Sequence, residues 1–185
     1  MGKFGFKLGY FVRAYLRLFD VDSVVAEAER YFMNYWLMKS EPDVYSIADL
    51  KGDRTCTWDG VRNYQARNFM REMSRGDLVF FYHSNTKIPG IVGLVRVVET
   101  GIADPTQFDM NSEYYDRKSQ LDVPRWQTVD VEFVEEFAKL ISLDLLKQKF
   151  SADEIWVVRK GTRLSVMPVS ESSAQKISKI RESND

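Results

Sequence analysis

The segment Asp77-Leu78-Val79-Phe80-Phe81-Tyr82 sets the architecture of this chain, and His83-Ser84-Asn85 follows it directly. Every residue from Leu78 to Tyr82 is apolar or aromatic, so a strand built from them has no polar face. Such a strand is stable only when both of its faces are covered. We therefore expect a central strand of a sheet, with three polar side chains at its end.

Further strands and helices are predicted on both sides of this strand, in a mixed order of α and β segments. The predicted strands cover residues 35–39, 90–98, 126–137 and 163–169, the third with period-two alternation. The predicted helices cover residues 46–50, 62–73, 142–150 and 170–180. Ser142 and Ser170 are the expected N-caps of the last two helices. Residues 155–158 fit neither pattern.

The first 32 residues differ from the rest, since their apolar positions have the spacing of amphipathic helix. Arg13 and Arg17 interrupt the apolar run and no small-residue cleavage site follows, so a signal peptide is rejected. We expect an N-terminal helical extension over residues 1–32 and one domain over residues 33–182. The extension is either a packing or oligomerisation helix or sequence upstream of a native start at Met33.

Composition excludes several classes of site. Cys56 is the only cysteine and His83 the only histidine, which excludes an internal disulfide, a multi-cysteine zinc site and a His-rich metal site. A reducing compartment, the cytoplasm, fits this usage. The net charge of −1 provides no overall basic field for nonspecific nucleic-acid binding. No apolar stretch is long enough to span a bilayer, so we expect no membrane partner, and we expect no metal and no cofactor.

The segment with the strongest binding chemistry is Trp58-Asp59-Gly60-Val61-Arg62-Asn63-Tyr64-Gln65-Ala66-Arg67-Asn68. Its aromatic faces, amides and guanidinium groups suit a flat, heteroatom-rich ligand such as a nucleobase with phosphate nearby. Five arginines between residues 53 and 76 make a local basic surface on a neutral protein. The alternative interpretation is an arginine-rich, solvated helix face with its aromatic residues packed underneath.

Five motifs in this order resemble the EVE domain family: Tyr-Trp-Leu-Met-Lys-Ser-Glu-Pro (35–42), residues 58–68, Phe-Tyr-His-Ser-Asn (81–85), Gln-Phe-Asp (107–109) with Tyr-Tyr-Asp (114–116), and Arg-Leu-Ser-Val-Met-Pro-Val (163–169). The resemblance covers about Asn34 to Ile180. It implies an α+β fold of PUA-like type, a partly closed mixed β-barrel flanked by helices, with kinship to YTH and ASCH domains. Members include bacterial single-domain proteins, and we expect a bacterial protein. The resemblance also implies a pocket for modified bases in DNA, such as 5-methylcytosine, after their extrusion from the duplex.

A pocket for an extruded base needs a stacking surface and hydrogen-bonding groups that distinguish the base edge. The predicted base-binding residues are Trp36, Ser40, Glu41, Trp58, Asn63, Tyr64, Tyr82, His83, Ser84, Asn85, Phe108 and Ser165. The predicted phosphate-binding residues are Lys39, Arg62, Arg67 and Arg71. Trp58 is the favoured stacking surface. Core packing is the alternative for Trp36 and Phe108, and a structural role is the alternative for His83.

The favoured function is a non-enzymatic, monomeric module that binds one flipped, modified cytosine in DNA. One alternative is a reader of modified RNA of the YTH type, and another is a small enzyme that processes a nucleotide. Cys56 with His83, or Glu41 with Asp59, are the only conceivable catalytic pairs, and neither has a supporting motif. We therefore expect no catalytic residues.

Overall fold

The computed structural model describes residues 33–184 of the 185-residue chain, and the extension expected over residues 1–32 lies outside them. The six strands are β1 (Tyr35–Ser40), β2 (Thr55–Thr57), β3 (Leu78–His83), β4 (Gly90–Ala103), β5 (Gln127–Ser142) and β6 (Val166–Val169). They form one sheet in the order β2-β5-β4-β3-β1-β6. Only β1 and β3 pair in parallel, so the sheet is mixed.

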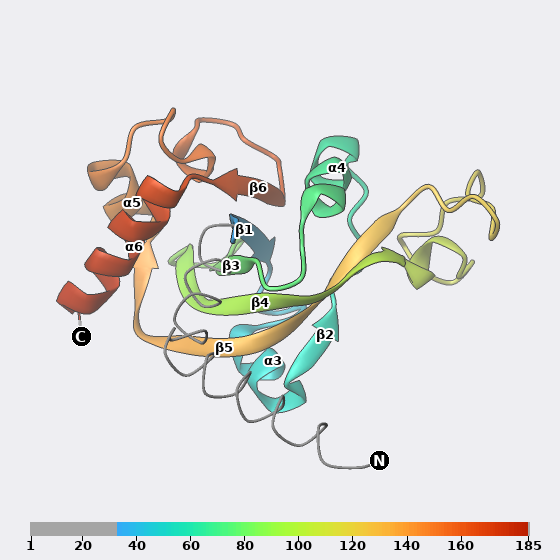
Figure 1. Ribbon diagram of the computed structural model, residues 1–185, viewed down its shortest axis with the longest axis horizontal. Helices are drawn as coiled ribbons and strands as arrows, with labels where there is room; N and C mark the ends of the chain where they lie inside the picture. Colours follow the sequence, from blue (N-terminus) through green and yellow to red (C-terminus); the bar gives the residue numbers. More distant parts are fainter. Residues whose placement is uncertain (1–32, 185) are drawn as a thin grey trace, which may run out of the picture. The chain divides into compact units, whose positions relative to one another are not determined.

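In the described part of the chain four α-helices flank this sheet: α3 (Ile47–Asp53), α4 (Tyr64–Glu72), α5 (Leu143–Lys149) and α6 (Glu171–Asn184). Two short 3-10 helices cover Pro105–Gln107 and Trp156–Val158, the second in the segment whose sequence fitted neither pattern. Helices α5 and α6 lie together near one end of β5, whereas the loop of residues 104–126 extends beyond the other end of the sheet (Figure 1).

The prediction of a central strand is confirmed, because β3 is buried on both faces. Val79 and Phe81 belong to one apolar cluster, which contains residues of α3 and α4. Phe80 belongs to a second cluster, which contains residues of α5 and α6. Strand β1 alternates in the same way, with Leu37 opposite Phe80 in the parallel ladder. The sheet therefore separates two apolar cores.

Within residues 33–184 the sheet has two edge strands, β2 and β6, which are the first and last in the order and do not pair with each other. Strand β6 begins at Val166, later than the predicted start at residue 163. A hydrogen bond of 2.8 Å from the Lys39 amide to the Ser165 carbonyl extends its pairing with β1 by one residue. The α+β fold, with a mixed and incompletely closed sheet flanked by helices, is confirmed.

Polar side chains at the helix starts explain the observed helix boundaries. Asn63 accepts hydrogen bonds from the amides of Gln65 and Ala66, so α4 begins at Tyr64 rather than at residue 62. Ser142 caps α5 as predicted, and its hydroxyl accepts from the Leu145 amide. Helix α4 is thereby fixed directly after the segment that carries Trp58.

Candidate functional site

A cavity of about 900 Å³ lies where the sheet is not closed. One of its walls comes from edge strand β2, with Cys56 and Thr57, and another from the segment just before β6, residues 163–165. The end of β1 contributes Lys39, Ser40 and Glu41. The remaining lining residues are Val44, Tyr45, Trp58, Asp59, Gly60, Val61, Arg62, Ser84, Glu113 and Tyr114.

A glycine turn next to Trp58 brings the loop of residues 104–116 against the cavity. Gly60 has a φ of +76°, a conformation that favours glycine. A Cβ atom at this position would lie 2.9 Å from the ring of Tyr114, so only glycine admits the ring so close. The Gly60 amide also donates to a carboxylate oxygen of Asp104 at 3.0 Å. The half-buried Tyr114 ring thus becomes part of the cavity wall.

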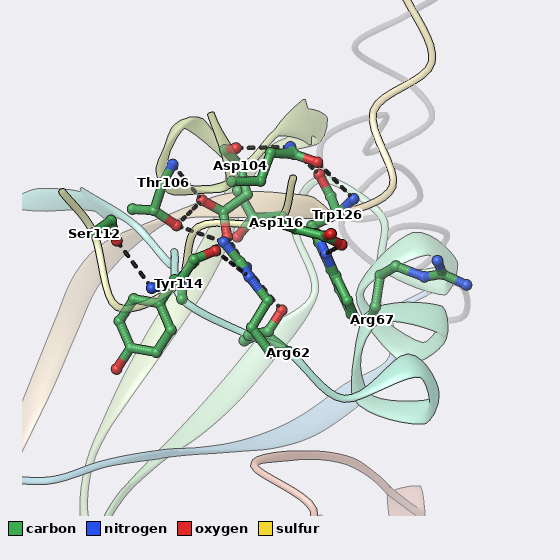
Figure 2. A network of polar contacts seen from close by, with 12 residues as sticks. Arg62, Arg67, Asp104, Thr106, Ser112, Tyr114, Asp116 and Trp126 are labelled. Atoms are coloured by element: carbon green, nitrogen blue, oxygen red, sulfur yellow. Dashed lines mark hydrogen bonds and ion pairs between the residues drawn. The ribbon is translucent and has the colours of Figure 1, made fainter. Parts of the chain in front are cut away.

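Arg62 holds the Tyr114 loop in place through several hydrogen bonds (Figure 2). Its guanidinium donates to the Tyr114 carbonyl at 2.7 Å, to the Asp104 carboxylate at 2.7 Å and to the Thr106 hydroxyl at 2.8 Å. Nearly all of its hydrogen-bonding capacity is therefore used within the protein. These contacts make Arg62 a positioning residue for the Tyr114 loop, and phosphate binding by Arg62 stays a prediction.

Trp58 forms the inner wall of the cavity and is also part of the core, with 7% of its surface exposed. Its ring packs edge-on against Phe81 at a centroid distance of 5.2 Å. The backbone is held by β5, since the Trp58 amide donates to the Val129 carbonyl and the Thr128 hydroxyl donates to the Trp58 carbonyl. Stacking of a base on Trp58 stays a prediction, because the ring has little free surface to offer.

The parallel strands β1 and β3 bring two predicted segments to the same end of the sheet. Ser84 donates from its amide to the Ser40 carbonyl at 2.8 Å, and both side chains line the cavity. The Ser40 hydroxyl donates to the Tyr45 carbonyl at 2.6 Å. Glu41 accepts from the Asn85 amide group at 2.8 Å. Both hydroxyls retain oxygen lone pairs that can accept hydrogen bonds from a ligand.

The cavity wall contains charged groups without close partners in the described part of the chain. Asp59 makes no side-chain hydrogen bond or ion pair with residues 33–184. Partial burial, together with the nearby Asp104 carboxylate, raises its pKa, which Arg62 counteracts. Burial lowers the pKa of Lys39, whose ammonium lies 5.9 Å from the ring centroid of Tyr82. The side chains of Asp59 and Lys39 can therefore interact with a polar ligand in the cavity.

Comparison with known proteins identifies this architecture. The family model of the EVE domain matches residues 34–180. This chain belongs to the EVE domain family. The resemblance seen in the sequence motifs is thereby confirmed. Thymocyte nuclear protein 1 of Rattus norvegicus is 43% identical over 167 residues, which span 80% of this chain and 74% of that protein.

Solved EVE domain structures superpose on this one. A protein of Pseudomonas putida is 48% identical, with a TM-score of 0.77, over 80% of this chain and 99% of that chain. Human thymocyte nuclear protein 1 (THYN1), solved in complex with 5-methylcytosine-containing DNA, is 41% identical, with a TM-score of 0.76, over 80% of this chain and 98% of that chain. Since relatives occur in both eukaryotes and bacteria, the expected bacterial origin stays a prediction.

Several predicted base-binding residues of this EVE domain lie away from the cavity, and we remove them from the candidate site. Trp36 is 4% exposed in the core, and its indole N–H donates to the buried Asp77 at 2.8 Å. Asn63 caps α4 with its side chain. Tyr64 stacks on Trp126 at a centroid distance of 4.9 Å. Each of these groups has an intramolecular partner that accounts for its residue type.

The strand-end residue His83 and the loop residue Phe108 also lie outside the cavity wall. His83 accepts a hydrogen bond at Nε2 from the Ile47 amide, 3.2 Å away, and so secures the start of α3. Phe108 is half-buried at the end of the first 3-10 helix. Tyr82 and Asn85 line a second, neighbouring cavity instead.

The remaining arginines predicted for phosphate lie along α4 and not in the cavity wall. The Arg67 guanidinium lies 4.8 Å from the ring centroid of Tyr64 and donates to the Arg125 carbonyl at 2.9 Å. Arg71 donates to the Gln127 side chain at 2.6 Å. Both side chains thus bind to the protein's own loop and to β5.

Four important members of the wall were not among the predicted site residues: Asp59, Gly60, Tyr114 and Arg163. The Asp-Gly pair was visible as a turn signal, but its contact with Tyr114 joins positions more than fifty residues apart. Arg163 lies ahead of β6 and forms no hydrogen bond or ion pair within residues 33–184. Nothing in its local sequence distinguishes it from an ordinary surface arginine.

The described residues contain neither a metal cluster nor an activated thiol. No group of three or more His, Cys, Asp or Glu within residues 33–184 is arranged to hold a metal ion. Burial raises the pKa of the Cys56 thiol to about 11, so the nucleophilic thiolate is scarce at neutral pH. None of the helices in this part of the chain is long and apolar enough to cross a membrane.

Proposed function

We propose that this chain is a binding module that holds one extruded base of a DNA strand, a cytosine modified at its 5 position, in the cavity beside Trp58. The observation that carries the proposal is the composition of one cavity wall, in which Trp58 and Tyr114 lie next to the unpaired carboxylate of Asp59. The complex of the relative THYN1 with 5-methylcytosine-containing DNA supports the same ligand class.

The size of the cavity suits a nucleoside. Its volume of about 900 Å³ falls within the range of about 300–1,000 Å³ that is typical of small-molecule sites. Extrusion of a base costs a few kcal/mol, and stacking on an aromatic ring returns roughly 1–3 kcal/mol. Tyr114 is half-buried and offers more ring surface than Trp58 does, so we assign the stacking contact to Tyr114.

Asp59 would supply the identity of the base. The N4 amine of cytosine is a hydrogen-bond donor, and a carboxylate is its natural acceptor. Thymine and uracil place the O4 acceptor at the same position, where it would face the carboxylate without a proton between them. A buried, unpaired acceptor of this kind costs roughly 1–3 kcal/mol, which is enough to reject those bases.

The 5-methyl group would be recognised by apolar surface in the same cavity. Val44 and Leu164 both contribute to its wall. Burial of one methylene-sized group contributes about 0.8 kcal/mol, or about a fourfold preference over unmodified cytosine. No chemical step is part of the proposal, because Cys56 is held as a thiol and His83 is engaged with α3.

A titration with fluorescent oligonucleotides tests the proposal. Matched DNA strands carry one 5-methylcytosine, cytosine or thymine, and a matched RNA strand carries 5-methylcytosine. We expect the order 5-methylcytosine, cytosine, thymine in DNA, and a reduced margin between cytosine and thymine for Asp59→Ala. Asp122→Ala is the control, since Asp122 is exposed and lines neither cavity.

Four outcomes would overturn this assignment or a part of it. Equal affinity of the wild-type protein for all DNA strands would show that it does not recognise a modified base. Tighter binding of the RNA strand would show that RNA is the preferred ligand. An unchanged preference in Asp59→Ala would show that Asp59 does not distinguish the bases. Conversion of any nucleotide to a product during incubation would replace the binding module with an enzyme.

A further inference from the structure

A second cavity, of about 610 Å³, adjoins the first. Lys39 and Ser84 belong to the walls of both cavities, so the two hollows share one boundary at the ends of β1 and β3. The other lining residues are Tyr82, Asn85, Pro89, Leu143, Lys147, Val157, Val158, Arg159, Lys160, Gly161 and Thr162. Asp59, which is proposed to contact the base edge, does not line this second cavity.

Among the described residues, the wall of the second cavity includes four cationic side chains and no carboxylate, so it carries a net positive charge. The side chains of Lys39 and Lys160 form no hydrogen bond or ion pair with residues 33–184. Lys147 has only a distant partner, Asp144, at 4.0 Å, and the Asp144 side chain is 89% exposed. Solvent-exposed pairs of this kind are weak and are easily exchanged for another anion.

Arg159, the fourth cation, is more restrained but also keeps charge available. Its Nε donates to the Ala152 carbonyl at 2.7 Å, and its guanidinium lies 4.4 Å from the ring centroid of Trp156. Its acidic neighbour Asp153 is 3.9 Å away and fully exposed. The Trp156 indole and the Ala152 carbonyl orient the Arg159 side chain but do not neutralise its positive charge.

The arginines near α4 contrast with this cluster. Arg62, Arg67 and Arg71 each donate to a group of the protein itself, with Asp104 a buried counter-ion for Arg62. Apart from Arg163 in the wall of the base cavity itself, the uncommitted positive charge around that cavity is therefore found at the second cavity. A nucleotide carries its phosphates on either side of the sugar, so a bound base requires an anion site on an adjoining surface.

We propose that the second cavity binds a phosphodiester group of the DNA strand whose base occupies the first cavity. Lys147 and Lys160 contact the phosphate oxygens, and Lys39 lies at the boundary where the sugar joins phosphate to base. This inference rests on the proposed function, and it places the strand along the β1–β3 ends and residues 157–162 rather than along α4.

The test compares two double variants that remove the same charge. Lys147→Ala/Lys160→Ala removes the proposed contacts, whereas Lys149→Ala/Lys179→Ala removes two exposed lysines of α5 and α6 that line neither cavity. Affinity for a single-stranded, 5-methylcytosine-containing oligonucleotide is measured between about 50 and 200 mM salt. Affinity for free 5-methyl-2′-deoxycytidine is measured in parallel, and thermal melting checks that both variants are folded.

Loss of two phosphate contacts makes the slope of log affinity against log salt shallower by about 1.4 for single-stranded DNA. We expect this change for Lys147→Ala/Lys160→Ala, with unchanged nucleoside affinity, and a wild-type slope for the control. A wild-type slope in the test variant, or an equal change in the control, would overturn the inference. Failure of the wild-type protein to prefer the methylated strand would instead overturn the proposed function, and the salt slopes would still report on the phosphate site.

Discussion

Arg62, which lines the base cavity, forms an ion pair of 2.7 Å with Asp104, whose side chain is only 2% exposed. The same carboxylate accepts from the Gly60 amide and the same guanidinium donates to the Tyr114 carbonyl. The Gly60 turn and the Tyr114 loop, which both belong to the cavity wall, are therefore hydrogen-bonded to the same ion pair. We therefore expect this ion pair to stabilise the domain and to hold Tyr114 in position.

Asp104→Asn should destabilise the protein strongly, because it leaves the Arg62 guanidinium with a neutral partner in a mostly buried site. Removal of one charge from a buried pair costs roughly 3–5 kcal/mol. Glu132→Gln is the control, since the Arg96–Glu132 pair has a similar length of 2.9 Å but is exposed and should contribute at most about 1 kcal/mol. Urea denaturation measures both, and equal losses would contradict a special role for Arg62–Asp104.

Gly60→Ala should weaken ligand binding more than its effect on folding suggests. A left-handed alanine costs about 1–2 kcal/mol, and at this position the new methyl group also displaces the Tyr114 ring. Gly101→Ala separates the two effects, because Gly101 has a similar φ of +71° but nothing lies within 4 Å of its Cβ position. We expect the two variants to have comparable unfolding curves, and only Gly60→Ala to bind the oligonucleotide more weakly. Equal affinities of the two variants would show that the Gly60 turn does not contribute to ligand binding.

Tyr114→Ala should weaken binding of the modified base by roughly 1–3 kcal/mol, the contribution of one stacking contact. Tyr114→Phe keeps the ring and should retain most of the affinity. The neighbouring Tyr115 is 42% exposed and lines neither cavity, so Tyr115→Ala serves as a control. Fluorescence titration distinguishes the variants, and unchanged affinity in Tyr114→Ala would return the stacking assignment to Trp58.

The features that could be predicted from sequence are those fixed by local chemistry. Strand β3 was predicted because its five apolar residues require cover on both faces, and the Ser142 cap because its hydroxyl acts on an amide three residues away. Ser40 and Ser84 were both predicted as base-binding residues, and they meet at the ends of the parallel strands β1 and β3. Interactions between residues that are close in the sequence determine the strand and the helix cap.

The predicted ligand-binding side chains that bind to the protein itself have partners far away in the chain. The Trp36 indole is satisfied by Asp77, 41 positions later, and Arg62 by Asp104, 42 positions later. No pattern around Trp36 or Arg62 distinguishes such a committed group from a free one. The same limitation hid Asp59, whose importance comes from the absence of a partner within residues 33–184.

His83 provides a test of a different kind, because it is the only histidine in the chain. Its Nε2 must be unprotonated to accept from the Ile47 amide. Burial lowers the pKa of His83, and the carboxylates of Asp49 in α3 and Glu136 in β5 partly oppose this shift. The folded state therefore prefers the neutral imidazole.

Acidification should reduce the stability of the wild-type protein through this residue. Below the unfolded-state pKa of about 6.5, the unfolded chain binds a proton that folded His83 resists, so the free energy of unfolding falls as the pH decreases toward the folded pKa. His83→Gln keeps a neutral acceptor at every pH and leaves all carboxylates in place. Urea denaturation at about pH 7.5 and about pH 5.5 should show a larger loss for wild type than for His83→Gln, whereas parallel losses would mean that His83 is protonated equally in both states.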